Sequence, residues 1–169
     1  ILDVTKASSL SVNAIMPSQV AYANAVLSRI DRPDFMAVRI GKKSVYHIVF
    51  ENPSIAFLRY LNLNSEVISL LKAATGGETL FLSNIEAMRN DIIRNINATI
   101  NYYRVQNRRE VNYIYITGGS ALHRYLSSDI DSELHSSVEF LRLFEPDARR
   151  GSSPPEEFDS CISLALNNN

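Results

Sequence analysis

The chain has 169 residues, which is enough for one domain or two small subdomains around a real core. Its formal net charge of −1 gives no electrostatic support for a nucleic acid or an anionic membrane surface as the main partner, and no run approaches the roughly 18 apolar residues of a membrane span. The single cysteine, Cys161, excludes an internal disulfide, and its apolar surroundings favour an inert buried thiol over a nucleophile.

The first part of the chain predicts a short strand and then a helix. Leu10–Met16 alternates apolar and polar residues, as a half-buried strand does. Pro17 suits the first turn of a helix, and apolar residues then recur at helical spacing up to Ile30. The charged segment Asp31–Asp34 ends this helix. Because the sequence opens at Ile1 without an initiator methionine, we expect the chain to be part of a longer protein.

Three strand-like runs follow in quick succession, over Phe35–Gly41, Ser44–Phe50 and Ile55–Leu63. The linkers between them are too short for a crossover connection, so we expect an antiparallel meander. Lys42 and Lys43 form the tip of the first hairpin. Two cations at such a tip either meet phosphate groups or simply keep the turn soluble.

Two helices are predicted next, and the second is the longest element of the chain. Asn64–Ala74 carries its apolar residues on one side and ends at a glycine pair. Ser83 and Glu86 have the spacing of a capping box at the start of the second helix. Apolar residues then recur every three or four positions as far as Asn107, which predicts a buried stripe along about six turns. The arginines between them, Arg89 included, are expected on a solvated face.

One stretch combines a buried strand, a glycine turn and the start of a helix. Tyr113–Thr117 has the aromatic and β-branched character of a strand that is covered on both faces. Gly118 and Gly119 allow a sharp turn, and Ser120 can cap a helix whose apolar stripe continues to Leu134. Free N–H groups gathered at such a turn suit an anion or a nucleotide, although the glycines can equally make nothing more than a tight corner.

The C-terminal part of the chain predicts one more strand and one more helix. Val138–Phe144 should pair in parallel with the preceding strand and complete a β-α-β unit. Glu145–Glu157 contains three prolines and is expected to be a surface loop. Phe158–Leu166 is expected to close the chain as a helix.

Signals for metal binding or nucleophilic catalysis are weak. His47, His123 and His135 lie far apart in the sequence, and no C-x-x-C or carboxylate cluster at ligand spacing accompanies them. We therefore expect no metal site and interpret the histidines as ordinary surface or half-buried residues. Gly118–Leu122 begins like a G-x-S-x-G elbow but ends in leucine, so Ser120 is expected to cap a helix, with His123 pointing away from it. No catalytic residue is predicted, and the Rossmann and Walker A patterns are absent.

Several features in a fixed order resemble the actin/Hsp70/sugar-kinase superfamily. They are a strand that ends in Ile40–Gly41, an immediate meander, a long helix with Glu86 at its start, and then Ile116–Ser120. The chain is similar more narrowly to the PilM family, the actin-like cytoplasmic proteins of type IV pilus assembly. Three short segments carry that narrower resemblance: Leu10–Ser18, Tyr102–Arg104 and Ser160–Leu166.

The resemblance implies an α/β, ribonuclease H-like actin-type domain with helices on both faces of a mixed sheet. The sheet would combine the antiparallel meander with the parallel β-α-β unit. Residues 1–31 would be the crossing segment from a preceding first domain. Residues 32–169 would form the second actin-like domain, with a subdomain insertion at about residues 64–84.

The resemblance also implies where a nucleotide would lie. The first hairpin tip resembles the second phosphate loop of the superfamily, and the glycine pair resembles the adenosine loop. The implied cofactor-binding residues are Gly41, Lys42 and Lys43 on the phosphate side and Gly118, Gly119 and Ser120 on the adenosine side of one crevice. ATP with Mg²⁺ is the implied cofactor of the longer protein, whereas tight binding by this chain alone is not expected.

Two departures from the family pattern weaken the case for ATP turnover. The second phosphate loop usually begins with Asp-Ile-Gly, whose carboxylate orders the metal and water, but this chain has Arg39 in place of the aspartate. Arg39 cannot hold a cation, so metal-assisted hydrolysis is in doubt here. Asn62–Asn64 also replaces the glycine pair that the family often shows after its third meander strand.

The leading hypothesis is therefore a non-enzymatic actin-like scaffold of a bacterial type IV pilus or type II secretion complex. It would be cytoplasmic, held at the inner membrane by the PilN-like N-terminal peptide of a partner, and open to self-association. One alternative is an active ATPase or kinase of the same superfamily, with its catalytic residues in the preceding half. Another is an α/β-hydrolase-like module that uses Ser120.

Overall fold

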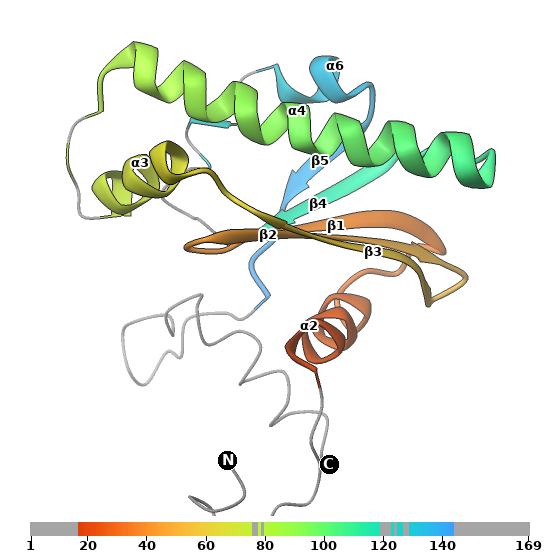
Figure 1. The fold of residues 1–169 in the computed structure, drawn as a ribbon. Helices are drawn as coiled ribbons and strands as arrows, with labels where there is room; N and C mark the ends of the chain where they lie inside the picture. The colour runs from red at the N-terminus through yellow and green to blue at the C-terminus, as the bar shows by residue number, and fades with distance from the viewer. Residues whose placement is uncertain are drawn as a thin grey trace, which may run out of the picture.

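The computed structural model describes residues 17–75, 78, 80–118, 123, 125, 126 and 129–143. Within them, a five-stranded sheet has helices on both faces (Figure 1). The strands are β1 (Asp34–Ile40), β2 (Ser44–Glu51), β3 (Ser54–Asn62), β4 (Tyr113–Thr117) and β5 (Ser137–Phe140). They lie side by side in the order β3-β2-β1-β4-β5.

The sheet is mixed, as the fold prediction requires. β1, β2 and β3 pair antiparallel in a meander, whereas β4 pairs in parallel with β1 on one side and with β5 on the other. The five expected strands that fall within the described residues are confirmed, with ends that differ by a few residues. Gly41 lies outside β1 because its N–H donates to the carbonyl of Ser44 at 2.8 Å and so closes the hairpin.

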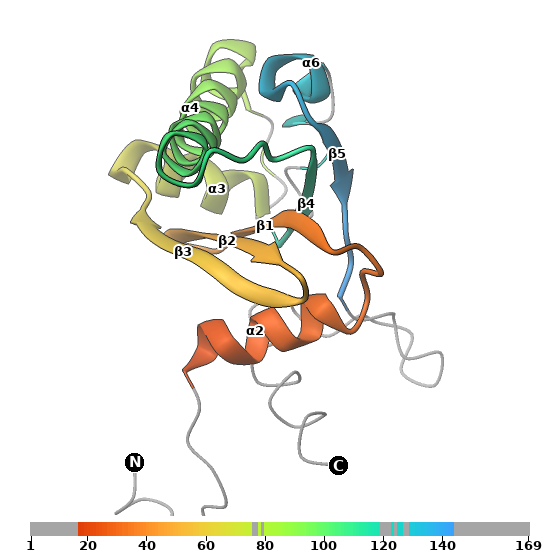
Figure 2. The same cartoon turned by 90° about the vertical axis from the view of Figure 1, so that its right-hand side faces the viewer.

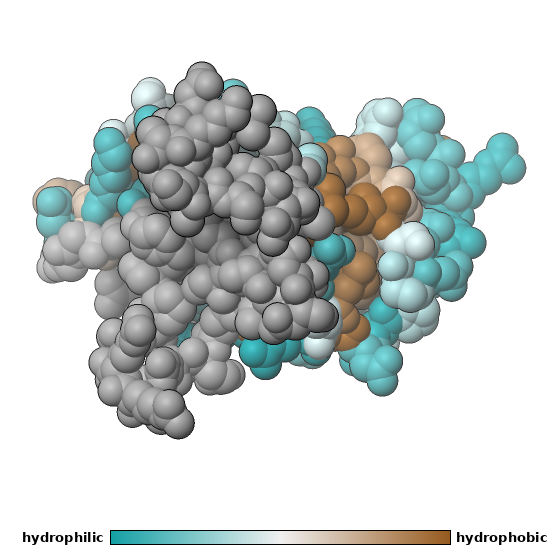
Figure 3. Space-filling model, turned by 90° about the horizontal axis from the view of Figure 1, so that it is seen from below, coloured by the Kyte–Doolittle hydropathy of each residue, from teal (hydrophilic) through white to brown (hydrophobic). Residues whose placement is uncertain are grey.

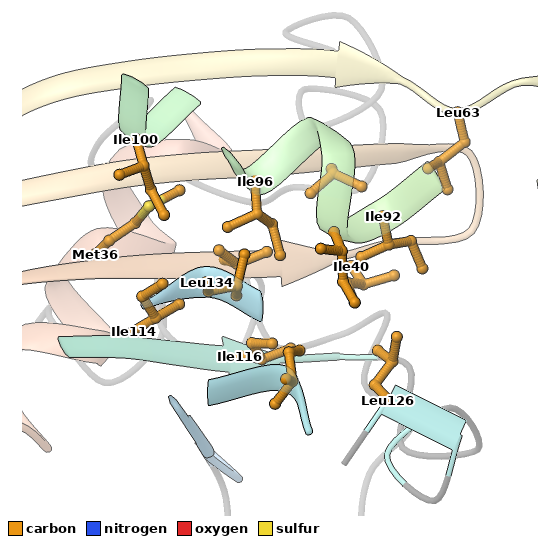
Figure 4. Close-up of a cluster of buried hydrophobic side chains, with 14 of the residues drawn as sticks. Met36, Ile40, Leu63, Ile92, Ile96, Ile100, Ile114, Ile116, Leu126 and Leu134 are labelled. Atoms are coloured by element: carbon orange, nitrogen blue, oxygen red, sulfur yellow. The ribbon is translucent and has the colours of Figure 1, made fainter. Parts of the chain in front are cut away.

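Among the described residues, the upper face of the sheet is covered by α3 (Ser65–Thr75), α4 (Leu82–Asn107) and α6 (Ile130–Leu134). Figure 2 shows them on one side of the sheet. The predicted stripe of α4 supplies Met88, Ile92 and Ile96, which are almost fully buried in the upper core cluster. Figure 4 shows Ile92 and Ile96 of this stripe among side chains of β1 and β4. Burying each such side chain contributes roughly 1.5–3 kcal/mol, so this layer supplies much of the stability.

The lower face is covered by α2 (Ser18–Leu27), and Pro17, which was predicted as the first residue of this helix, is its N-cap. Tyr22 of α2 is buried there in a second core cluster with Phe35, Phe50 and Tyr115 of the sheet. The rings of Phe35 and Phe50 stack with centroids 4.6 Å apart, and Tyr115 meets Phe35 edge-on at 5.5 Å. Such aromatic pairs add about 0.5–1.5 kcal/mol beyond the area they bury.

The predicted capping box at the start of α4 is wrong. The helix begins at Leu82, and its N-cap is Phe81, which makes no capping hydrogen bond through its side chain. Asn84 and Ile85 donate their N–H groups to the carbonyl of Phe81 instead. Ser83 therefore already lies inside the first turn, where its side chain can no longer serve as the N-cap.

The single helix predicted after the glycine turn is interrupted. Residue 123 and residues 125 and 126 are helical, but Asp129 has a left-handed backbone with φ of 55°, and α6 begins after it. Leu126, Ile130 and Leu134 are nevertheless all buried in the upper core, as the stripe predicted. Leu126, before the break, and α6, after it, therefore contribute apolar side chains to the same core.

Two polar side chains are less exposed than predicted. His47 is fully buried under α4, where its Nδ1 lies 2.6 Å from Thr99 Oγ1. Arg89 is largely covered and pairs with Glu133 of α6 at 2.5 Å. Both contacts join elements that are distant in the sequence, so periodicity along one helix or strand could not reveal them.

Several sequence predictions lie outside the described residues. They are the strand at Leu10–Met16, the loop at Glu145–Glu157 and the closing helix with Cys161. None of the helices in the described part is long and apolar enough to cross a membrane.

Candidate functional site

The predicted phosphate corner and glycine corner meet at one edge of the sheet. β1 and β4 run in parallel and end together, with Arg39 opposite Thr117. The next residue of β4's chain, Gly118, has φ of 74° and packs against the backbone of Ile40. A Cβ added at Gly118 would lie 2.3 Å from the carbonyl oxygen of Ile40, which leaves no room for any other residue.

This packing accounts for Gly118 without any ligand. The space that a side chain would need is filled by the protein's own backbone, so the glycine permits β1 and β4 to end in contact. Lys42 and Lys43 are exposed at the adjoining hairpin tip. Gly119 and Ser120, the other two residues predicted on the adenosine side, lie outside the described residues.

Arg39 lies on the lower side of this edge, among aromatic rings. Its Cζ atom is 5.8 Å from the ring centroid of Tyr22 and 5.9 Å from that of Tyr46. The hydroxyl of Tyr22 also lies 2.6 Å from Thr117 Oγ1, a buried hydrogen bond between α2 and the end of β4. A guanidinium near two ring faces is held by cation–π attraction, which fixes a positive charge beside Gly41.

His123 is a neighbour of the glycine corner that the sequence reasoning missed. Its Nε2 lies 3.2 Å from the carbonyl oxygen of Gly118, in position to donate a hydrogen bond. Its ring also packs against Phe140 of β5, with centroids 4.5 Å apart. The imidazole therefore connects Gly118, at the end of β4, with Phe140 of β5, and no local sequence motif predicts these contacts.

The described residues of this corner suit phosphate better than a metal ion. Arg39, Lys42 and Lys43 bring three positive charges to the end of β1 and the hairpin tip. No group of three histidine, cysteine or carboxylate side chains that could hold a metal was found in the described part of the chain. Arg39 cannot ligate a cation, and the resemblance implies a metal-ordering carboxylate at its position, so these residues do not fit Mg²⁺.

A hollow of about 220 Å³ lies elsewhere, between α3 and α4. Its walls include Val67 and Met88 together with the charged side chains of Glu66, Asp91 and Arg94. Arg94 forms an ion pair with Asp91, so the charges at this hollow are partly neutralised within the protein. The hollow therefore offers no concentrated charge comparable with that of the hairpin tip.

Comparison with known proteins gives no sequence match but a clear structural one. No family model and no curated protein matches the sequence. A solved structure described as the PilM-PilN type IV pilus biogenesis complex superposes on 98% of this chain with a TM-score of 0.70 at 19% identity. The chain has the actin-like fold. This confirms the fold class that the order of motifs predicted.

Two further structures share this fold. The ethanolamine utilization protein EutJ from Carboxydothermus hydrogenoformans matches 96% of the chain with a TM-score of 0.54 and 16% identity. An activator of 2-hydroxyisocaproyl-CoA dehydratase from Clostridium difficile, solved with bound ADPNP, matches 93% with a TM-score of 0.52 and 10% identity. The chain spans 56% of the matched chain in the pilus complex, 58% of EutJ and 68% of the activator.

Proposed function

We propose that the chain is an actin-like scaffold component of a bacterial type IV pilus or type II secretion assembly complex. The observation that carries the proposal is the superposition on 98% of the chain with the PilM-PilN structure, at a TM-score of 0.70. In this proposal residues 1–31 cross from a preceding domain, and residues 32–169 form a second actin-like domain with an insertion at about residues 64–84. The protein is cytoplasmic and reaches the inner membrane through a partner.

The proposed partner is the N-terminal peptide of a PilN-like inner-membrane protein. The experiment is calorimetric titration of the longer protein that contains this chain with that peptide from the same organism. Saturable binding, together with loss of pilus or secretion activity when the gene is deleted, is the expected result. A scrambled peptide of the same composition is the control. Absence of binding combined with intact assembly would refute the scaffold proposal.

We further propose that the corner of β1 and β4 binds the phosphates of a nucleotide without a metal ion. Lys42 and Lys43 face solvent at the hairpin tip, and the Arg39 guanidinium is held beside Gly41. Gly118, Gly119 and Ser120 complete the proposed adenosine side. The three cations would neutralise phosphate charge directly, which is the task that Mg²⁺ performs where a carboxylate precedes the loop.

Nucleotide binding is tested by titrating the longer protein with ATP in the presence of EDTA or of Mg²⁺. We expect similar affinity in both, and about tenfold weaker binding when Lys42 and Lys43 are both changed to alanine, because two phosphate contacts are lost. Arg94→Ala, which removes an exposed cation from α4, is the matched control and should leave the affinity unchanged. Binding that requires Mg²⁺ would refute the metal-free site.

The second candidate function is an active ATPase or kinase of the same fold. The Clostridium difficile activator, which was solved with bound ADPNP, favours it at the level of the fold. The distinguishing measurement is phosphate release by the longer protein with ATP and Mg²⁺. Robust turnover would defeat the non-enzymatic scaffold and support this candidate, whereas binding without turnover would exclude it.

A further inference from the structure

Four neighbouring strands each place one residue in a row across the lower side of the sheet, at the end where the hairpin tip lies. Arg39 of β1 is directly opposite Thr117 of β4 on one side and Tyr46 of β2 on the other. Tyr46 is in turn opposite Tyr60 of β3. Residues that lie opposite each other on paired strands project from the same face of the sheet. We call these four residues the transverse row.

Tyr22 of α2 lies beneath the transverse row and contacts two of its members. Its hydroxyl is 2.6 Å from Thr117 Oγ1, and its ring centroid is 5.8 Å from the Cζ atom of Arg39. Tyr22 is buried in the lower core, so its ring is a fixed surface for the guanidinium. The ring centroid of Tyr46 lies at a similar distance from Cζ, 5.9 Å. Cation–π attraction to two rings therefore restricts where the guanidinium can go.

The ring of Tyr46 is itself supported by the outermost member of the row. The centroids of Tyr46 and Tyr60 are 5.2 Å apart, and the Tyr60 hydroxyl donates to Asn62 Oδ1 at 2.9 Å. Tyr46 is half-buried and Tyr60 is 50% exposed, so the row opens to solvent towards β3. Figure 3 views the molecule from this lower side and shows hydrophobic residues at the surface beside the grey atoms. Tyr46 can therefore be changed without opening the buried core around Tyr22.

The guanidinium that these rings hold lies at the base of the hairpin tip. Arg39 Nη1 is 3.8 Å from the point at which a Cβ added to Gly41 would lie, and Lys42 and Lys43 follow directly. An arginine side chain that is free in the unbound protein loses conformational freedom when it binds an anion, which weakens binding. A guanidinium that is already held beside the tip avoids most of this loss.

We infer that Tyr22 and Tyr46 are positioning residues, which hold the Arg39 guanidinium ready for the phosphate groups of the ligand. Tyr60 supports Tyr46 in this role. The inference rests on the proposed phosphate site and adds to it the residues that act through Arg39. At Tyr46 the aromatic ring carries the role and the hydroxyl does not, because only the ring takes part in the contacts with Arg39 and Tyr60.

The first test is calorimetric titration of the longer protein with inorganic tripolyphosphate in EDTA, a probe that has phosphates but no nucleoside. Tyr46→Leu should bind roughly two- to fivefold more weakly, which is the range expected for one lost cation–π contact. Tyr46→Phe keeps the ring and should bind like the wild type. Tyr60→Leu should weaken binding by a smaller factor, because it removes only the supporting ring. Tyr102→Leu, at a 51% exposed tyrosine of α4, is the matched control and should have no effect.

A double-mutant cycle separates positioning from a general structural effect. Arg39→Gln alone should weaken tripolyphosphate binding by about tenfold, because one charge-assisted contact is lost. In the Arg39→Gln background, Tyr46→Leu should cause no further loss, since the side chain through which it acts is gone. If Tyr46 were needed only for folding of the hairpin, its substitution would weaken both backgrounds by the same factor. Circular dichroism checks that every variant is folded.

The second test needs no ligand. Protons above a ring face are shifted upfield, so in protein labelled with ¹⁵N-arginine the Nε–H signal of Arg39 should move downfield in Tyr46→Leu and stay in place in Tyr46→Phe. A wild type that binds no tripolyphosphate would refute the proposed phosphate site itself. The positioning role alone would be overturned by an Arg39 signal that Tyr46→Leu leaves unchanged, by equal weakening in Tyr46→Phe and Tyr46→Leu, or by an additive cycle with Arg39→Gln.

Discussion

The buried imidazole of His47 should make the stability of the protein depend on pH. The side chain is completely shielded from solvent, its Nδ1 contacts Thr99 Oγ1, and its Nε2 has no hydrogen-bond partner among the described residues. Burial, with the nearby positive charge of Arg59 as a second cause, lowers the pKa of His47 to about 3. In the unfolded chain the pKa of His47 is about 6.5.

The sign of the effect follows from which state takes up the proton. Because the pKa is lowered in the folded protein, the unfolded state binds a proton first as the pH falls below about 6.5. The stability that His47 contributes is complete above that pH and is lost progressively as the pH falls towards 3. Between about pH 8 and about pH 5 the loss amounts to about 2 kcal/mol, since each pH unit below the unfolded pKa costs about 1.4 kcal/mol.

The assay is urea denaturation of the wild type and of His47→Asn over this pH range. Asparagine can keep a hydrogen bond to Thr99 but does not titrate, so the stability difference between the two proteins isolates the imidazole. On acidification from about pH 8 to about pH 5, the free energy of unfolding of the wild type should fall by about 2 kcal/mol relative to that of His47→Asn. His135→Asn, at an exposed residue whose left-handed backbone asparagine tolerates, is the control and should follow the wild type. Parallel curves for the wild type and His47→Asn would refute the reasoning.

Two further substitutions test the corner between β1 and β4. Gly118→Ala should lower the free energy of unfolding by roughly 2–4 kcal/mol, because the backbone is left-handed and the added carbon would meet the carbonyl of Ile40. Urea denaturation measures this loss. Tyr22→Phe should cost about 1–3 kcal/mol, because it removes the buried hydrogen bond and leaves Thr117 Oγ1 without that partner. Thermal unfolding followed by circular dichroism measures this second loss.

Each of these substitutions has a milder counterpart in the chain. Gly41→Ala places its carbon 3.1 Å from the carbonyl of Ser44 without a left-handed backbone, so it should cost clearly less than Gly118→Ala. Tyr60→Phe removes an exposed hydroxyl bond at 2.9 Å and should cost less than Tyr22→Phe. Equal losses within either pair would contradict the packing described for the corner.

Local chemistry was sufficient to predict the antiparallel meander and the strand at the centre of the chain's second half. The short linkers around Lys42 and after Glu51 permit only antiparallel neighbours, and the registers of β1, β2 and β3 confirm this. The strand at Tyr113–Thr117 was recognisable because a run covered on both faces needs β-branched and aromatic residues throughout. These features depend on neighbours along the chain, which is why composition and spacing reveal them.

Element boundaries were harder to predict, because a local motif can be satisfied in more than one way. Ser83 and Glu86 match a capping box, yet the chain enters α4 at Leu82, and the carbonyl of Phe81 accepts the first helical bonds. The apolar stripe through Leu134 was correct, but nothing in that spacing indicates the left-handed residue at Asp129 that divides the helix.

The side chains that surround the site could not be predicted from the sequence. Tyr22 and Thr117 are 95 positions apart, and only the packing of α2 under the sheet brings their hydroxyls together. The tyrosine rings beside Arg39 and the contact of His123 with Gly118 likewise depend on tertiary structure. The order of motifs could indicate which corners would meet, but not which side chains would line them.

The bond between Tyr22 and Thr117 gives α2 a mechanical role. It fastens the only described helix beneath the sheet to the last residue of β4, immediately before the turn at Gly118. If α2 moves sideways, either this hydrogen bond breaks or the end of β4 moves together with α2. A segment joined to the N-terminus of α2 can therefore change the distance between the two corners. A conformational change in that segment would reach the corners through α2, without passing through the upper core.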